Sequence, residues 1–535
     1  MLMHTKTGRT VSAVLLCLMI LNAGMAQVLK APPRKEGEGP WSQLIIRGVT
    51  LINGNLSPPL GPVDIVVENN RITAVQPVGA PGQKIDASRR PQLKAGGKEL
   101  NAEGLYLMPG FVDTHGHIGG TAQGTPAEYV FKLWMAHGIT TVVDPGCSNG
   151  LDWVLEEKAR SAKNEITAPR LKAYTRFGAG SQTTIATGVQ AREWVRNNAR
   201  AGADGIKFFG ASPEVMSAAL DENKKLGLRS KMHHSQTWVG GWNVLNSARA
   251  GLTSMEHWYG LPEAMFTDRT VQHYSLDYNY QNEQDRFGEA GTLWKQTAAP
   301  FSEKWNQVMN ELLSLNFTLS PTFVAYLANR DLMALRRAEW HENYTLPSLW
   351  DFYTPTRGSH GSYWFSWGTE QEIQWKENFR LWMAFINEYK NRGGRVTIGT
   401  DAGFIYNLYG FAYVNEMQLM REAGFHPLEV IKAATLSGAE ALGMDKEIGT
   451  VEVGKLADFV ITEENPLTNL QTLYGTGAIK VTDDNRVVRV GGIKYTVKDG
   501  IIYDARKLLA DVKDMVDAAK AKTGYKIMQP GLKGF

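Results

Sequence analysis

Histidine, lysine and aspartate side chains recur at the ends of short apolar runs in the middle of this 535-residue chain. The first run ends in His115-Gly116-His117, and residues two apart on a strand point to the same face. Later runs end in residues of metal-ligand type, namely Lys207, His233 with its neighbour His234, His257 and Asp401. Burying so many polar side chains together is costly unless something pairs them. A divalent metal is the simplest partner, so the pattern predicts a metal site.

The elements that must position these residues alternate between β-type runs and helical stretches. The runs lie at about 107–117, 139–146, 170–177, 205–210, 229–235, 253–258, 317–324 and 395–402. This alternation is typical of βα units packed as a parallel sheet, and eight strands favour a closed (β/α)8 TIM barrel. Barrel active sites lie at the carboxyl ends of the strands, so the candidate ligands share one rim.

Both ends of the chain are rich in strand-type sequence. Turns at Asn53-Gly54 and Asn69-Asn70 divide alternating runs near the N-terminus, and similar runs at 449–454, 458–461, 487–490 and 501–503 follow the barrel region. We therefore predict an α/β protein in which a small β domain has a first part at 41–107 and a second part at 447–504. The barrel occupies 108–446, and a helical tail fills 505–535, where apolar residues recur at helical spacing.

Residues 1–26 are typical of a secretory signal peptide. Lys6 and Arg9 precede an apolar run from Val11 to Leu21, and small residues follow at Ala23 to Ala26. The run is shorter than the roughly 20 residues of a spanning helix. We expect an exported protein, periplasmic or secreted, with no stable membrane insertion after cleavage. Cys147 would be the only thiol of the mature chain, so no intrachain disulfide can form.

The composition restricts the partners. Apolar residues make up 43% of the chain and charged residues 21%, as in globular proteins with a sizeable core. Lys and Arg number 57 against 54 Asp and Glu, a formal charge of +3, so no global field recruits nucleic acid. We expect a small-molecule substrate as the partner, and homo-oligomer formation stays open.

The order His-x-His, Lys, His, His, Asp over strands one, four, five, six and eight resembles the amidohydrolase superfamily. Residues 107–117 and 449–460 look like its opening and closing motifs. The likeness is closest to the imidazolonepropionase-like and prolidase-like branch with a carboxylated lysine. It implies a distorted barrel and a companion β-sandwich formed by both chain ends. The fifth-strand motif reads His233-His234-Ser235 where the family has His-Ala-His, so either histidine fits as the ligand.

The resemblance also implies two divalent metal ions, with zinc expected. His115, His117 and Asp401 would hold one ion, His233 and His257 the other, and Lys207 would bridge them after carboxylation by carbon dioxide or bicarbonate. A hydroxide that bridges the metals would then attack an amide or related acyl carbonyl, as in a dipeptide or an N-acyl amino acid. Asp401 would be the catalytic residue that accepts the proton and passes it to the leaving nitrogen.

The roles of three further residues, and several alternative functions, stay open. Tyr174 and Arg176 on the third strand could bind a substrate carboxylate or simply pack in the wall, and His360 lies in an unusually aromatic segment, 325–390. The alternatives within enzymes are a mononuclear deaminase, with Lys207 as a wall residue, and a lactonase or esterase of the same fold. The non-enzyme alternative is an exported metal-containing binding protein that uses the aromatic segment for recognition.

Overall fold

The barrel sheet contains eight parallel strands in the order β13-β12-β11-β10-β9-β8-β7-β6, which confirms the predicted barrel class. The computed structural model describes residues 28–356, 360–361 and 366–525. The strands are β6 (Phe111–Asp113), β7 (Ile139–Gly146), β8 (Arg170–Arg176), β9 (Gly205–Phe208), β10 (Arg229–Met232), β11 (Ser254–Glu256), β12 (Thr318–Ser320) and β13 (Arg395–Val396). Several of them are only two to four residues long, so the polar residues that follow lie just beyond the strand ends.

Backbone hydrogen bonds close the sheet between its first and last strands. The Thr114 N–H donates to the Ile398 carbonyl at 2.9 Å, and the Asp401 N–H donates to the His115 carbonyl at 2.8 Å. Gly399 permits this approach, because a Cβ atom there would lie 2.9 Å from the Cβ of His115. The closure thus brings the segments that carry His115 and Asp401 side by side.

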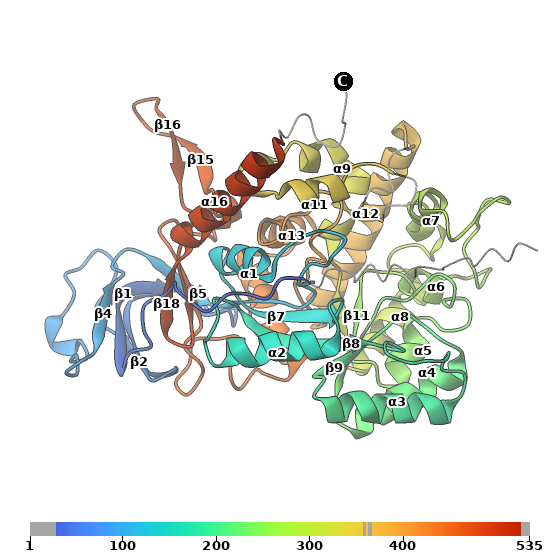
Figure 1. The fold of residues 1–535 in the computed structure, drawn as a ribbon, viewed down its shortest axis with the longest axis horizontal. Helices are drawn as coiled ribbons and strands as arrows, with labels where there is room; N and C mark the ends of the chain where they lie inside the picture. The colour runs from blue at the N-terminus through green and yellow to red at the C-terminus, as the bar shows by residue number, and fades with distance from the viewer. Residues whose placement is uncertain (1–27, 357–359, 362–365, 526–535) are drawn as a thin grey trace, which may run out of the picture.

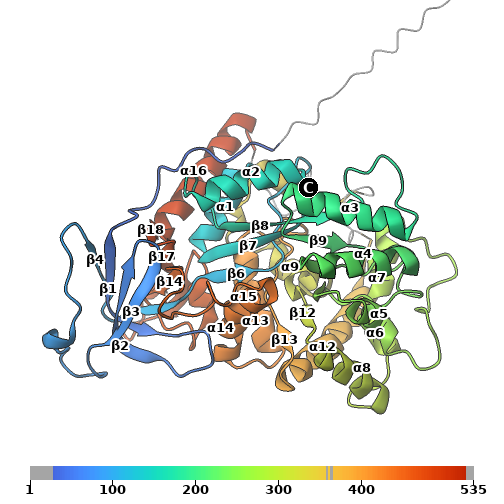
Figure 2. The same cartoon turned by 90° about the horizontal axis from the view of Figure 1, so that it is seen from below.

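Helices cover the outside of the barrel (Figures 1 and 2). They include α1 (Ala127–Ala136), α2 (Leu151–Ala162), α3 (Gly188–Ala201), α4 (Pro213–Lys225), α5 (Val244–Arg249), α8 (Glu303–Ser314), α13 (Phe411–Glu422), α14 (Pro427–Ala434) and α15 (Leu436–Leu442). Local sequence signals set their ends. In α3, Thr187 and Gln190 form a capping box at the start, and Gly202 adopts the left-handed conformation that ends the helix.

A second sheet at one end of the molecule combines the two ends of the chain (Figure 2). Its order is β18-β17-β14-β5-β1-β2-β3, with β4 paired to β1. The strands are β1 (Gln43–Leu51), β2 (Leu60–Glu68), β3 (Arg71–Pro77), β4 (Lys98–Asn101), β5 (Tyr106–Pro109), β14 (Phe459–Thr462), β17 (Ile493–Lys498) and β18 (Ile501–Asp504). Ile46, Ile65, Phe459 and Val497 belong to its buried apolar core.

The structure corrects three of the predicted strands. The run 107–117 divides at Gly110 into β5 of the end sheet and β6 of the barrel, because the chain passes Thr140 so closely that a Cβ at Gly110 would lie 2.1 Å from its Oγ1. No strand forms at 449–454, where the Val451 N–H donates to Asn53 Oδ1 at 2.6 Å. The run at 487–490 pairs with β15 (Ala478–Val481) as β16 (Val487–Val490), a separate hairpin that projects from the body (Figure 1).

Two long connections follow β11 and β12. The first contains α6 (Leu261–Ala264), α7 (Glu283–Ala290) and α8, and the second contains the 3-10 turn η3 (Phe323–Tyr326), α9 (Leu327–Arg336), α10 (His341–Tyr344), α11 (Pro347–Phe352) and α12 (Thr369–Asn391). Long βα connections in barrels commonly serve the active site. Part of the predicted aromatic segment, 357–359 and 362–365, lies outside the described residues.

The C-terminal helix α16 (Ala505–Thr523) packs beside α1 (Figure 1). Its apolar stripe is buried, and Asp511 pairs with Lys132 of α1 at 3.1 Å. The predicted signal peptide, 1–26, lies outside the described residues. Within the part of the chain that the structure describes, no helix is long and apolar enough to cross a membrane.

Candidate metal centre and substrate cavity

A cavity of about 400 Å³ opens at the carboxyl ends of the barrel strands. Its lining includes every predicted metal ligand, namely His115, His117, Lys207, His233, His257 and Asp401. Strand ends on β6, β9, β10, β11 and β13 supply these side chains. The structure thus brings the candidate ligands into one site, and their individual roles stay predictions.

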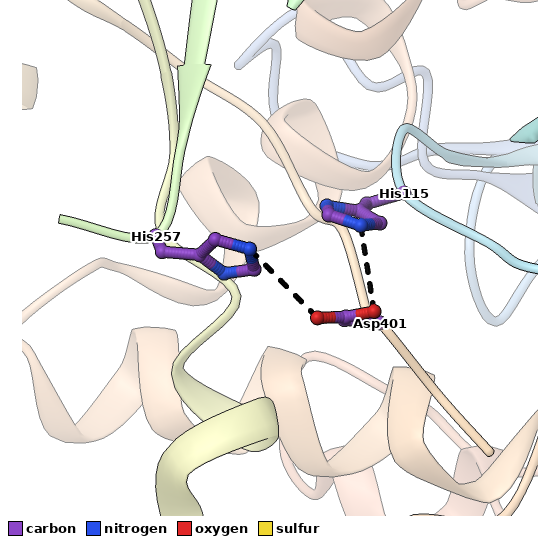
Figure 3. Close-up of side chains that lie close together, drawn as sticks. All are labelled: His115, His257 and Asp401. Atoms are coloured by element: carbon purple, nitrogen blue, oxygen red, sulfur yellow. Dashed lines mark ion pairs between the residues drawn. The ribbon is translucent and has the colours of Figure 1, made fainter. Parts of the chain in front are cut away.

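Asp401 lies at the centre of the cluster. Its carboxylate is 3.4 Å from His115 Nε2, 3.1 Å from His117 Nε2 and 3.8 Å from His257 Nε2. Figure 3 shows His115 and His257 on two sides of the Asp401 carboxylate. One ligand atom from each of these three residues lies within 4.8 Å of the other two. Since metal–ligand bonds to nitrogen and oxygen are about 2 Å long, this donor set fits a divalent ion.

The other ring nitrogens of these histidines face buried acceptors that our sequence interpretation missed. His115 Nδ1 lies 3.1 Å from Glu256 Oε1, His117 Nδ1 lies 3.7 Å from Asp144 Oδ1, and His257 Nδ1 lies 2.5 Å from Thr322 Oγ1. Two of these acceptors could have been proposed from the sequence, because Asp144 is near the end of a predicted strand and Glu256 directly precedes His257.

The neighbouring histidines of β10 point in different directions. The ring of His233 faces the cavity, 4.7 Å from the ring of His257 and 5.4 Å from that of Tyr259. The ring of His234 is fully buried elsewhere, where its Nε2 makes a 2.8 Å hydrogen bond with Ser247 Oγ. His233, which lines the cavity, is therefore the histidine placed to act as the fifth-strand ligand.

The weaker substrate-binding candidates divide between the cavity and the core. Tyr174 is buried with Val112 and Val143 and is not among the residues that line the cavity, and its contact with substrate stays a prediction. Arg176 lies two residues further along β8, on the same face, and lines the cavity. Its guanidinium lies over the ring of Phe209 at 5.0 Å and has no acidic partner among the described residues.

His360 also lines the cavity, on the side formed by the long connections. Its Nδ1 lies 2.9 Å from Glu283 Oε2, and the same oxygen accepts from Arg286 at 2.7 Å. Rings of Tyr259 and Tyr326 line the cavity as well. This side of the cavity therefore combines aromatic rings with the His360–Glu283–Arg286 cluster.

Burial and close charges perturb the titrating groups of the cluster. Burial lowers the pKa of Lys207 well below its usual value, although the lysine is paired with Glu256. Burial opposes protonation of His117, but the carboxylates of Asp144 and Asp401 raise its pKa to about 9. Burial would raise the pKa of Asp401, yet the surrounding imidazoles hold it well below the usual range. Such clustered shifts are typical of functional sites.

The chain shares short stretches of sequence, and its fold, with known proteins. A model of the amidohydrolase family matches residues 381–501. The adenine deaminase of Methanoculleus marisnigri is 29% identical over 177 residues, which cover 32% of this chain and 33% of that protein. The imidazolonepropionase of Symbiobacterium thermophilum is 33% identical over 102 residues, 18% of this chain and 23% of that protein. The matched segments span a third or less of these relatives.

Solved structures match over most of the chain. A putative prolidase from Bifidobacterium longum has a TM-score of 0.58 at 20% identity, covering 90% of this chain and 100% of that one. Bottromycin amidohydrolase has a TM-score of 0.61 at 18% identity, covering 90% and 91%. These likenesses show a common fold. The family match over residues 381–501 supports the resemblance to the amidohydrolase superfamily.

Proposed function

We propose that this protein is a metal-dependent hydrolase that cleaves an amide or related acyl bond in a small molecule such as a dipeptide or an N-acyl amino acid. One observation carries the proposal: six side chains of metal-ligand type, from five strand ends, line a single cavity. Isolated histidines are common in cores, but this set meets at the barrel face where active sites lie.

Two divalent ions, with zinc the expected metal, account for the whole set. His115, His117 and Asp401 would hold one ion and His233 and His257 the other. Lys207 would join them after its amine forms an N–C bond with carbon dioxide and loses a proton, giving an anionic carbamate. Burial supports this step because it lowers the pKa of Lys207 and so favours the reactive neutral amine. When bound, such ions polarise a carbonyl and lower the pKa of water.

The protein's own groups would orient the substrate and move the proton. Asp401 is ionised at neutral pH and faces the centre of the cluster, so it can accept a proton from the attacking water and return it to the leaving nitrogen. Arg176 would bind a substrate carboxylate, because its guanidinium has no acidic partner among the described residues. The aromatic rings of Tyr259 and Tyr326 would exclude water from the bound substrate.

A mononuclear deaminase is the second candidate. It is favoured by the adenine deaminase relative and by the ion pair between Lys207 and Glu256, which is consistent with an unmodified Lys207 amine. In that case Lys207 would be a wall residue and one metal ion would suffice. The metal content of the active protein separates the two candidates.

The test combines metal analysis with a substrate panel. The purified mature protein is expected to contain close to two divalent ions per chain and to hydrolyse members of a panel of dipeptides, N-acyl amino acids, aryl esters and lactones. Lys207→Ala should lose metal and most activity, and short carboxylic acids should partly restore both. One ion per chain in an active preparation, or full activity of Lys207→Ala without added acids, would overturn the binuclear proposal.

We also propose that the protein is exported to the periplasm or beyond the cell. The support is the arrangement of basic, apolar and small residues in 1–26. Expression of the whole chain in a bacterium, followed by fractionation and N-terminal sequencing, should give a shortened protein that starts near Gln27. Recovery of the full-length chain in the cytoplasm would refute this proposal.

A further inference from the structure

The three histidines around Asp401 share one orientation. Each directs Nε2 toward Asp401, and each directs Nδ1 toward a buried acceptor on a different element. For His257 the hydrogen-bond donor is defined, because the Thr322 hydroxyl donates to the Pro321 carbonyl at 2.6 Å and so accepts from Nδ1–H. An Nδ1–H donor leaves Nε2 with a free lone pair, which is the form that binds a metal.

We propose that Asp144 and Glu256 are positioning residues that hold His117 and His115 in the tautomer and ring orientation needed to bind metal through Nε2. The proposal rests on the divalent-metal site of the proposed function. It assigns a role to two buried carboxylates that are not themselves in the ligand set.

Asp144 lies near the end of β7, and its side chain is 1% exposed. Neither carboxylate oxygen forms a hydrogen bond within the described part of the chain, and the nearest imidazole nitrogen is His117 Nδ1 at 3.7 Å. A buried carboxylate with so few partners destabilises a folded protein unless a nearby group offsets its charge. His117 is the group in position to do so, and a modest closing of this gap would give a hydrogen bond.

Glu256 ends β11, and its side chain is fully buried. Its Oε1 lies 3.1 Å from His115 Nδ1 and 3.3 Å from Lys231 Nζ, and its Oε2 pairs with Lys207. Lys207 and Lys231 are neighbours across the paired strands β9 and β10. If Lys207 is converted to a carbamate, the Lys231 amine remains 3.3 Å from Glu256. The carboxylate would then keep facing His115 Nδ1 while the metal ions bind.

Asp144→Asn and Glu256→Gln test the proposal, because each is nearly isosteric but removes the charge. An amide can turn either its oxygen or its NH2 group toward Nδ1, so it no longer selects one tautomer. Glu157→Gln is the matched control: Glu157 is also fully buried, but it lies on α2 and pairs with Arg160. The metal-free, full mature protein is titrated with Zn²⁺ in competition with a chromophoric chelator, and the Co²⁺ form is examined by visible absorption.

We expect Asp144→Asn and Glu256→Gln each to weaken Zn²⁺ affinity by roughly 10- to 100-fold, in line with other groups that orient metal-binding histidines. The Co²⁺ absorption bands should shift in both variants and stay unchanged in Glu157→Gln. Metal-free Asp144→Asn should still unfold cooperatively, because this carboxylate has no hydrogen bond to lose.

Unchanged Zn²⁺ affinity and Co²⁺ spectra in both variants would overturn the proposal. A loss of affinity that is matched by unfolding of the metal-free variants would assign a merely structural role and would also overturn it. If Glu256→Gln fails to fold, Asp144→Asn decides alone. A parent that binds metal but hydrolyses no substrate would refute the proposed reaction and leave the positioning result standing, whereas a parent that binds no divalent metal refutes both.

Discussion

Replacing Asp401 by asparagine separates its two proposed roles. The amide oxygen can occupy the place of the carboxylate oxygen that now lies 3.1 Å from His117 Nε2 and 3.4 Å from His115 Nε2. A ligand atom for the metal is therefore retained, although a neutral one. The proton acceptor is lost. We expect much of the metal to stay bound at saturating Zn²⁺, while turnover falls.

The expected size of the fall follows from the proposed role of Asp401 as a base. Positioned acid–base groups contribute about 10²–10⁴ in rate, so kcat should drop by roughly a hundredfold or more, equivalent to about 3 kcal/mol of transition-state stabilisation. The imidazoles around Asp401 hold its pKa well below the usual range, so the parent carboxylate stays ionised across the neutral pH range. The acidic limb of the pH–rate profile reports the attacking hydroxide and the base together rather than one residue, so it should change when the carboxylate is removed.

The assay is initial-rate hydrolysis of the best substrate of the panel at saturating Zn²⁺, with metal content measured on the same samples. Two further variants serve as controls. Asp401→Glu keeps the carboxylate but shifts it by one methylene, whereas Asp401→Ala removes ligand and base together and should lose metal as well. If Asp401→Asn turns over at nearly the parental rate with an unchanged pH profile, another group moves the proton, and His257 and His360 become the next candidates.

Three further outcomes are expected. Arg176→Met should raise KM for substrates with a free carboxylate by about tenfold or more, consistent with loss of a charge-assisted hydrogen bond, and should leave amidated analogues unchanged in the same kinetic assay. Deletion of residues 344–367 should alter which panel members are hydrolysed more than it alters metal content, and equal losses of both would mark the segment as structural. Burial lowers the pKa of His137 from 6.5 to about 4, so the folded protein resists protonation of this residue. The free energy of unfolding should therefore be highest above pH 6.5 and should fall by about 3 kcal/mol as the pH drops to about 4. His137→Gln should therefore flatten the dependence of the unfolding free energy on pH in that window, and an unchanged slope in denaturant titrations would refute this assignment.

The barrel and the gathering of polar groups at its rim could be predicted from the sequence because both depend on local patterns. Each βα unit carries its own apolar run, and parallel strands place their carboxyl ends at the same rim. Local sequence does not indicate, however, whether a strand residue lies in the core or reaches the cavity. Tyr174 and Arg176 share a face of β8, but the former lies among core side chains and only the latter reaches the cavity.

The partners behind the ligands could not be predicted, because they depend on contacts between distant strands. Asp144 meets His117 only after β6 and β7 pair, and the carboxylate of Glu256 meets His115 across the barrel. The division at Gly110 has the same origin, since it depends on how closely Thr140 approaches from the next strand. In a single sequence such residues look like ordinary strand-end or turn positions.

Three residues of the site adopt backbone conformations that the sequence gives no reason to expect. His257, Thr322 and Asp401 have φ angles of 62°, 51° and 49°, in the left-handed region that Gly and Asn usually occupy. Each such residue costs about 1–3 kcal/mol unless its surroundings stabilise it. In each case the turn follows one of the very short strands β11, β12 and β13. The hydrogen bond between His257 and Thr322 and the contact between His257 and Asp401 join all three residues. The strain is therefore concentrated where the chain leaves the sheet to direct a nitrogen, a hydroxyl and a carboxylate toward one another. Relieving it at any one position should disturb the metal site before it disturbs the barrel.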